Sequence, residues 1–186
     1  TNNDWAGTAE IAHATSAAGA FPLPAGSKDA ALLVKDVRPG SYTVHVTGHD
    51  DRNGLALAEI YALPGAGTAI SPRITNFSAR APVGTGNEIL IAGFEVHSGE
   101  ARLLIRASGP ALEPFGVPGF LGDPQLAVYR GATLITANDD WSTADTPSSA
   151  QTRVGAFAFE PGSKDAALIA TLSPGTYTVQ ISGIDG

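Results

Sequence analysis

The sequence contains no cysteine and no methionine. Without cysteine, the chain has no disulfide framework and no thiolate that acts as a nucleophile or a metal ligand. The absence of both sulfur residues also removes the side chains that oxidise most easily. This composition suits a protein that is exposed outside the cell, and we expect an extracellular or cell-surface location.

Basic residues and long apolar runs are also scarce. The chain has 11 Lys and Arg against 18 Asp and Glu, a formal net charge of −7, so nucleic acid and anionic membranes are poor partners. No apolar stretch approaches the roughly 18 residues of a membrane-spanning helix. The sequence also shows no nucleophile elbow and no phosphate-binding loop. We therefore predict a protein that is not an enzyme, needs no cofactor and does not span a membrane.

Turn-forming residues are abundant. The chain has 22 Gly and 13 Pro, and 43% of its residues are hydrophobic. Short strands separated by Gly and Pro turns are typical of an all-β sandwich or barrel. Residues 41–47 alternate cleanly, with Tyr42, Val44 and Val46 on one face, which is the pattern of a half-buried strand.

A long internal repeat dominates the sequence. Residues 26–32 (GSKDAAL) return letter for letter at 162–168, and the Asp-Trp pair that ends at Trp5 returns at Trp141. The offset is 136 residues, and it drops to 135 after Pro39. A period as long as a whole domain indicates tandem domains rather than a short-period solenoid.

The repeat divides the chain into three kinds of piece. We define the first piece as residues 73–137 and the last piece as 53–63. The middle piece occurs twice, as the N-terminal copy 2–50 and the C-terminal copy 138–185. The chain order is middle, last, first, middle, whereas a complete unit should run first, middle, last.

This order predicts two incomplete units. Residues 1–63 would be the C-terminal portion of one repeat unit, 64–72 a linker, and 73–186 a second unit that lacks its last strand. A sandwich that lacks a strand exposes backbone donors and acceptors along a sheet edge. Either the sequence is a window on a longer tandem array, or copies of the chain complete one another head-to-tail, as in donor-strand assembly. The predicted donor strand carries the apolar residues Leu55, Leu57, Ile60, Tyr61 and Leu63.

The fold class predicted is an all-β, antiparallel β-sandwich with one short helix in each middle piece. The first helix is expected at 9–18, with Thr8 as its N-cap. A hairpin-like turn is expected at 97–100, and a second hairpin around 130–132. The predicted strands span residues 30–37, 41–47, 55–63, 74–80, 88–96, 101–107, 126–129, 133–136, 166–172 and 176–182.

Several motifs resemble a known bacterial repeat. They are ITNFSAR at 74–80, LIRASGPAL at 104–112, DPQLAVY at 123–129 and NDDW at 138–141. Together they resemble a repeat of large secreted or surface proteins of environmental bacteria. The resemblance implies secretion and repetition, without an established activity.

The part from Asp123 onward is also similar to the bacterial pre-peptidase C-terminal domain. The similarity lies in Asp123-Pro124, the turn at 138–140 and the strand entry at 174–177. It implies a jelly-roll-like β-sandwich. Some relatives of that domain bind calcium, and some bind collagen or carbohydrate.

Four oxygen-bearing residues are candidate metal ligands: Asp123, Asn138, Asp139 and Asp140. Carboxylate and amide oxygens are the ligands that Ca²⁺ prefers. The alternative is an Asx-rich turn, since Asn and Asp satisfy backbone groups locally. The sequence therefore favours an extracellular structural protein of a filament or tandem array, and the alternative is a carbohydrate- or protein-binding module that depends on calcium.

Overall fold

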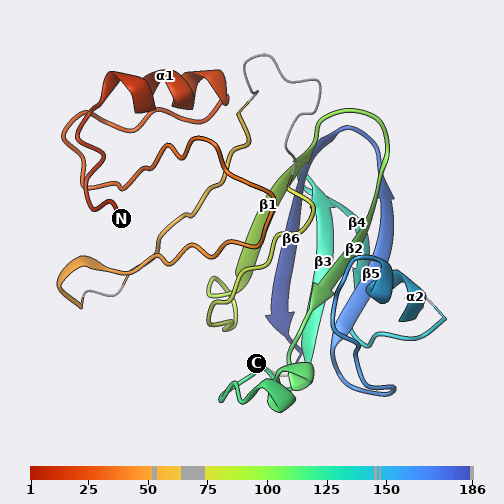
Figure 1. Cartoon of the computed structure of the whole chain (residues 1–186). Coiled ribbons are helices and arrows are strands. Elements are labelled where there is room, and N and C mark those ends of the chain that lie inside the picture. The colour runs from red at the N-terminus through yellow and green to blue at the C-terminus, as the bar shows by residue number, and fades with distance from the viewer. Residues whose placement is uncertain (52–53, 64–73, 145, 147, 185–186) are drawn as a thin grey trace. The chain divides into compact units, whose positions relative to one another are not determined.

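The computed structural model describes residues 1–186 except 52–53, 64–73, 145, 147 and 185–186 (Figure 1). The chain divides into two compact units, Thr1–Phe77 (unit 1) and Ser78–Gly186 (unit 2). The predicted linker at 64–72 lies outside the described residues. None of the described helices is long and apolar enough to cross a membrane.

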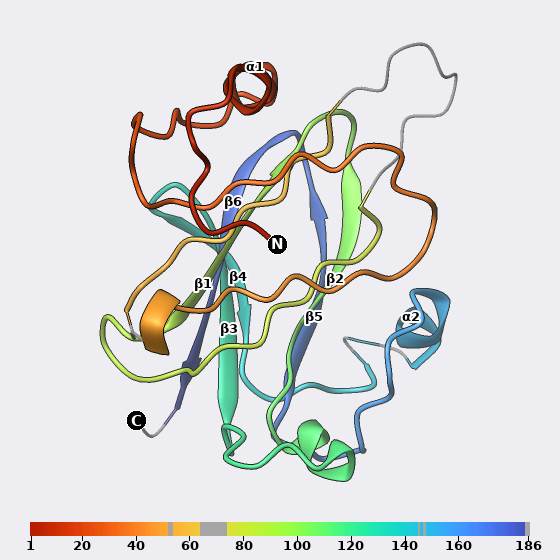
Figure 2. The same cartoon turned by 60° about the vertical axis from the view of Figure 1, so that its left-hand side comes forward.

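Unit 2 is built from two antiparallel sheets (Figure 2). One sheet has four strands in the order β1-β6-β3-β4, and the other pairs β2 with β5. This arrangement confirms the predicted all-β, sandwich-like class. The strands are β1 (Leu90–Val96), β2 (Ala101–Ala107), β3 (Pro124–Arg130), β4 (Thr133–Asn138), β5 (Ala166–Leu172) and β6 (Gly175–Gly183).

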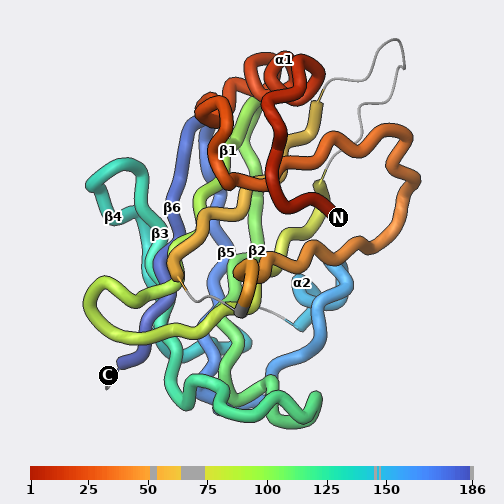
Figure 3. Tube along the Cα trace, turned by 90° about the vertical axis from the view of Figure 1, so that its left-hand side faces the viewer, coloured from red at the N-terminus to blue at the C-terminus, as the bar shows by residue number. Residues whose placement is uncertain are grey.

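One predicted hairpin is confirmed and the other is wrong. Strands β3 and β4 pair directly across the turn at Gly131 (Figure 3). Strand β1 instead pairs with β6, and β2 pairs with β5, so the turn at 97–100 carries the chain from one sheet to the other. The physical reason is that both strands find partners in the C-terminal middle piece, where Phe94 stacks on Tyr177 with ring centroids 5.6 Å apart.

The core of unit 2 lies between its two sheets. Alternate residues of each strand point inward, as the period of two requires. Val128 is fully buried at the centre of β3. Burying one such side chain stabilises the fold by about 1.5–3 kcal/mol relative to leaving it in water. The buried cluster consists of Val96, Ala107, Leu126, Val128, Ala166, Leu168, Ala170, Leu172, Tyr177 and Val179.

Each middle piece carries the predicted short helix. In unit 1 it is α1 (Ala9–Ala17), and in unit 2 it is α2 (Ser148–Arg153). Thr8 occupies the N-cap position of α1 with extended backbone, but its side chain makes no capping hydrogen bond. Two 3₁₀ helices complete the described helical elements, η1 (His49–Asp51) and η2 (Pro110–Phe115).

The strands predicted for unit 1 are not formed. Residues 30–37, 41–47 and 55–63 belong to no strand in the described part of the chain, and neither do residues 74–80. A strand is stabilised by ladder hydrogen bonds to a neighbour, so an alternating pattern without a partner does not produce a strand. The counterpart of residues 41–47 does form a strand in unit 2, within β6 (Gly175–Gly183), where β1 and β3 supply the ladder.

Candidate functional site

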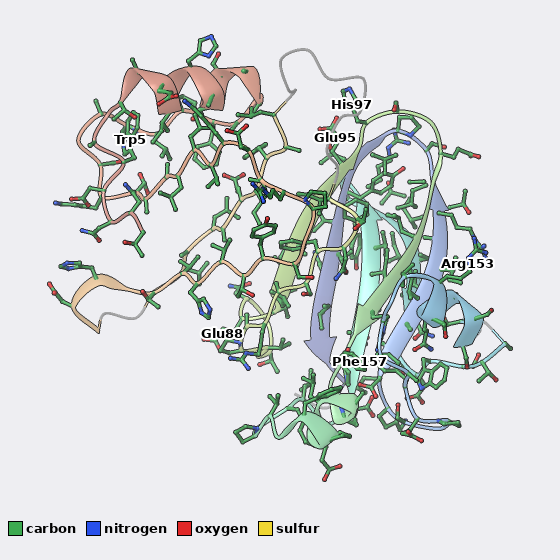
Figure 4. All side chains as sticks on the ribbon, viewed as in Figure 1. Trp5, Glu88, Glu95, His97, Arg153 and Phe157 are labelled. Atoms are coloured by element: carbon green, nitrogen blue, oxygen red, sulfur yellow. The ribbon has the colours of Figure 1, made fainter. Side chains whose placement is uncertain are left out.

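A tryptophan anchors the same local turn in both copies of the middle piece. The backbone N–H of Trp5 donates to the carbonyl of Asp29 at 2.8 Å, and that of Trp141 donates to the carbonyl of Asp165 at 2.8 Å. Both indole N–H groups donate to carbonyl oxygens 19 residues further along the chain. Both rings are buried, and Figure 4 shows Trp5 inside unit 1. Each tryptophan is therefore buried against the turn of its own copy and holds that turn by hydrogen bonds.

The asparagine that opens each copy completes this turn. The Oδ1 of Asn2 accepts from the N–H of Ala31 at 3.0 Å, and its Nδ2 donates to a carbonyl two residues on. Asn138 makes the same pair of bonds, with the N–H of Ala167 at 2.8 Å. The local sequence thus folds the same turn twice.

The two copies differ in the strand that ends each middle piece. Tyr177 on β6 is 3% exposed, whereas its counterpart Tyr42 is 66% exposed. Val179 is 6% exposed, whereas Val44 is 67% exposed. In unit 2 these residues lie opposite β1 and β3, which both belong to the first piece and both pair with β6. A closely similar sequence is a core strand in one unit and an exposed segment in the other.

The segment that corresponds to β5 shows the same difference. Leu168 is 6% exposed in unit 2, whereas Leu32 is 63% exposed in unit 1. We call the exposed residues of unit 1 whose counterparts belong to or pack on the core of unit 2 the open apolar set. Its members are Leu32, Val34, Tyr42, Val44 and Val46.

A buried carboxylate joins the first piece to the C-terminal middle piece. Asp165 is fully buried, and its Oδ1 accepts from the backbone N–H of Gly109 at 2.6 Å. The N–H of Ala111 donates to its Oδ2 at 3.1 Å, and the hydroxyl of Ser163 donates to the same oxygen at 2.6 Å. Hydrogen bonds to a charged group are the stronger kind, and a buried carboxylate depends on them.

The corresponding carboxylate of unit 1 is exposed. Asp29 keeps the local bond, because the hydroxyl of Ser27 donates to it at 2.6 Å. Its side chain lies at the surface, where water solvates the carboxylate. The local half of this arrangement is therefore present in unit 1 without the amide donors that the first piece supplies in unit 2.

An arginine of the first piece covers two rings of the C-terminal middle piece. The Cζ of Arg106 lies 3.7 Å from the ring centroid of Phe159 and 4.4 Å from that of Phe157. Phe157 lies beside η2, where its ring contacts Phe115 edge-on with centroids 5.0 Å apart (Figure 4). Burial lowers the pKa of Arg106 to about 10, and the charge of Asp165 opposes that shift. Arg106 therefore stays charged at neutral pH and makes a cation–π contact.

The predicted donor strand is exposed in unit 1. The residues named for it belong to no helix or strand, and all but the partly buried Leu63 are exposed. They are Leu55, Leu57, Ile60, Tyr61 and Leu63. A hydrogen bond from the hydroxyl of Tyr61 to Glu59, 2.9 Å long, raises the pKa of Tyr61. Its role as a donor stays a prediction.

Two of the four candidate metal ligands, Asp123 and Asp140, contact one lysine. Lys164 donates to Asp140 at 2.8 Å and lies 3.7 Å from Asp123. The hydrogen bond to Asp140 is the main cause that raises the pKa of Lys164. An open depression of 410 Å³ is lined by Gln125, Ala137, Asn138, Asp139 and Asp140. In the part of the chain that the structure describes, no three His, Cys, Asp or Glu side chains converge as a metal site would require.

Sequence reasoning missed the residues that join the two pieces. The identical GSKDAAL copies marked Asp29 and Asp165 as notable. Nothing in the sequence indicated that the backbone of Gly109 and Ala111 would meet that carboxylate, because backbone donors leave no side-chain signature. No protein-family model, no curated protein and no solved structure matches the chain.

Proposed function

We propose that the protein is an extracellular structural protein, a subunit or segment of a filament or tandem-domain array. Its jelly-roll-like sandwiches are completed by strands or half-domains from a neighbour. The observation that supports this proposal is the open apolar set, which repeats the core residues of unit 2 on the surface of unit 1.

Each side chain of the open apolar set gains about 1.5–3 kcal/mol when it is fully buried. Contiguous exposed apolar residues on a soluble protein mark an interaction site. Since the counterparts in unit 2 are buried by other strands of the same repeat, a polypeptide of that kind is the natural partner.

The last piece offers a route to head-to-tail assembly of copies. The sheet of unit 2 that pairs β2 with β5 has only these two strands in the described residues, so its edges are available for a further strand. An extended segment adds to such an edge through main-chain hydrogen bonds. One donor and one acceptor on each subunit form a heterologous contact, and such contacts propagate into a filament unless the ring closes.

The assembly test compares two faces of the last piece. In a strand, Leu57 and Tyr61 share one face, and Ala56 and Ala62 share the other. We expect the wild-type chain to form oligomers or filaments in electron microscopy and in sedimentation at rising concentration. The double variant Leu57→Lys and Tyr61→Lys should stay monomeric, because a lysine pair on the inward face of an added strand opposes its burial.

The control is the double variant Ala56→Lys and Ala62→Lys, which changes the net charge equally. It should assemble like the wild type. A wild-type chain that is monodisperse at every concentration, with no particles longer than a monomer, would contradict the proposal of assembly between copies.

A second candidate function is a carbohydrate- or protein-binding module that depends on calcium. The observation that favours it is the open depression with Asn138, Asp139 and Asp140 in its wall. Calcium bound there, with Asp123 nearby, would stabilise the folded state by mass action. A rise in Tm on titration with calcium chloride, absent with magnesium chloride, would support this function, and an unchanged Tm would count against it.

A further inference from the structure

The sequence contains unequal numbers of the pieces that make up a repeat unit. There are two middle pieces but only one first piece. In unit 2 that first piece is already engaged, since β1 pairs with β6 and β2 pairs with β5 over seven residues each. Adding further copies of the same chain supplies middle and first pieces in the same ratio of two to one. An assembly made only of residues 1–186 therefore leaves one middle piece of each copy without a first piece.

We infer that the N-terminal middle piece is a docking site for the first piece of a further repeat unit, and that Asp29 is its recognition residue. This inference rests on the proposed function and deepens it by naming the partner. The partner is a polypeptide of the sequence type of residues 78–137. It carries four strands equivalent to β1–β4, an arginine near the end of the second, and a Gly-Pro-Ala turn.

The apolar part of the interface follows from the register in unit 2. Tyr177 lies opposite Phe94 on β1, and the two rings stack with an interplanar angle of 19°. The hydroxyl of Tyr177 donates to a carbonyl four residues earlier at 2.8 Å, and Tyr42 makes the same bond at 2.7 Å. Tyr42 is therefore already held by its own turn, and a Phe94-like ring of the partner would cover it.

The polar part of the interface centres on Asp29. Its counterpart receives two backbone N–H groups from the Gly-Pro-Ala turn at Gly109. A side chain on Gly109 would collide with the carbonyl of Leu121, so only glycine brings that amide close to the carboxylate. The hydroxyl of Ser27 already orients Asp29 as Ser163 orients Asp165, which leaves the partner to add the amides.

An aromatic side chain extends the same site. Phe21 of unit 1 corresponds to Phe157, the ring over which Arg106 lies in unit 2. Phe21 is 54% exposed. The partner's arginine would lie over Phe21 and near the carboxylate of Asp29. The same guanidinium would then make a cation–π contact with the ring and an electrostatic interaction with the carboxylate.

The test adds the inferred partner to the chain in the order of the repeat unit, with the first piece before the middle piece. Residues 78–136 are fused directly before Thr1, which occupies the place of Ala137 in the repeat. Hydrogen exchange of residues 30–47, followed by mass spectrometry, then reports strand formation in unit 1. We expect exchange of this segment to slow by at least ~100-fold on grafting, towards the rate of residues 166–182, because ladder amides exchange through opening of the whole unit.

The variants separate recognition from general collapse onto an apolar surface. In the grafted chain, Asp29→Asn should restore at least ~10-fold faster exchange, because one charge-assisted acceptor is weakened. The same result is expected when the grafted copy of Gly109 is changed to Val. The matched control Lys28→Gln, which removes the neighbouring exposed charge, should leave exchange in the grafted chain unchanged.

Three outcomes would overturn the inference. Residues 30–47 exchange as slowly in the original chain as in the grafted one, or the graft leaves their exchange fast. Protection of the original chain that appears only at high concentration would assign the surface to a second copy instead, and would also overturn it. The assembly test is separate: a grafted chain that is protected but never forms filaments upholds this inference and rejects assembly between copies.

Discussion

The two copies of the middle piece are a natural comparison of one sequence in two settings. Their turns are the same: a buried tryptophan, an asparagine that bridges two backbone groups, and a Ser-to-Asp bond of 2.6 Å. Their strands are different, since Tyr177 is buried on β6 and Tyr42 is exposed. Local sequence is thus sufficient for the turn, and the strand requires the first piece.

The difference shows which interactions depend on sequence neighbours and which on distant chain. The hydrogen bonds of the turn join residues at most 29 positions apart. The contacts that bury the C-terminal middle piece span longer separations. At Asp165, for example, they join residues that are 54 and 56 positions apart in the sequence. Closing longer loops costs more entropy, so a long-range contact forms only when many others form with it.

The largest expected contrast is at the paired tyrosines. Tyr177→Ala should destabilise unit 2 by about 3–5 kcal/mol, since it removes a buried ring that stacks on Phe94. Tyr42→Ala should change stability by no more than about 0.5 kcal/mol, as for other surface substitutions. Urea unfolding measures the two effects separately: Trp141 fluorescence in a Trp5→Phe background reports on unit 2, and Trp5 fluorescence in a Trp141→Phe background reports on unit 1. Equal effects of the two substitutions would mean that unit 1 buries Tyr42 in solution.

The paired aspartates should show the next largest contrast. Asp165→Asn removes the charge from an acceptor of three hydrogen bonds, and should cost about 1.5–3 kcal/mol in the same urea experiment. Asp29→Asn should be nearly silent, because water solvates the exposed carboxylate. An Asp165 variant as stable as the wild type would show that the amides of Gly109 and Ala111 do not need the charge.

A smaller contrast is expected at the paired valines. Val179→Thr places a hydroxyl in the core between the sheets and should cost about 1–3 kcal/mol. Val44→Thr places the same hydroxyl in water and should leave thermal stability unchanged while it improves solubility. Calorimetry of both variants tests this, and a stability loss at position 44 would contradict the exposure of that segment.

The smallest effect concerns the paired lysines. Lys164→Met and Lys28→Met both remove exposed ion pairs, at 2.8 Å and 3.3 Å to aspartate, and such pairs contribute little. The raised pKa of Lys164 means that its contribution is complete below its ordinary pKa of 10.5 and is lost as pH rises through the raised value. Any difference between Lys164→Met and the wild type should therefore vanish at the alkaline end of a Tm-against-pH series.

Much of unit 2 could be predicted from the sequence, because its patterns are local. Alternation and turn residues located β2 and β5 at their observed bounds and placed the β3–β4 hairpin. The pairing of β1 with β6 could not be predicted, because the turn at 97–100 looks the same whether the strands pair or separate into two sheets. The absence of strands from the described part of unit 1 could not be predicted for a related reason. The alternating pattern at 41–47 shows that the segment can form a strand, and a strand forms only when a partner strand is present.

The predictions of the donor strand and of the metal ligands rested on fewer features of the sequence. The apolar residues from Leu55 to Leu63 follow the pattern of a strand. A donor strand is identified by the strand that it pairs with, and the sequence of the donor does not name that partner. Asn138 and Asp140 have the oxygens that calcium prefers, and the same oxygens serve the turn and Lys164. The same residues fit a calcium site and a hydrogen-bonded turn, so the sequence alone does not distinguish these two roles.

The central position of β6 has a consequence for biosynthesis. Both β1 and β3 pair with β6, yet β6 is the last strand of unit 2 to be translated. The β3–β4 hairpin can form as soon as both strands have left the ribosome, whereas β1 pairs in this sheet with β6 and so waits for nearly the whole unit to be translated. The first strand of unit 2 to be synthesised is therefore among the last to join its sheet.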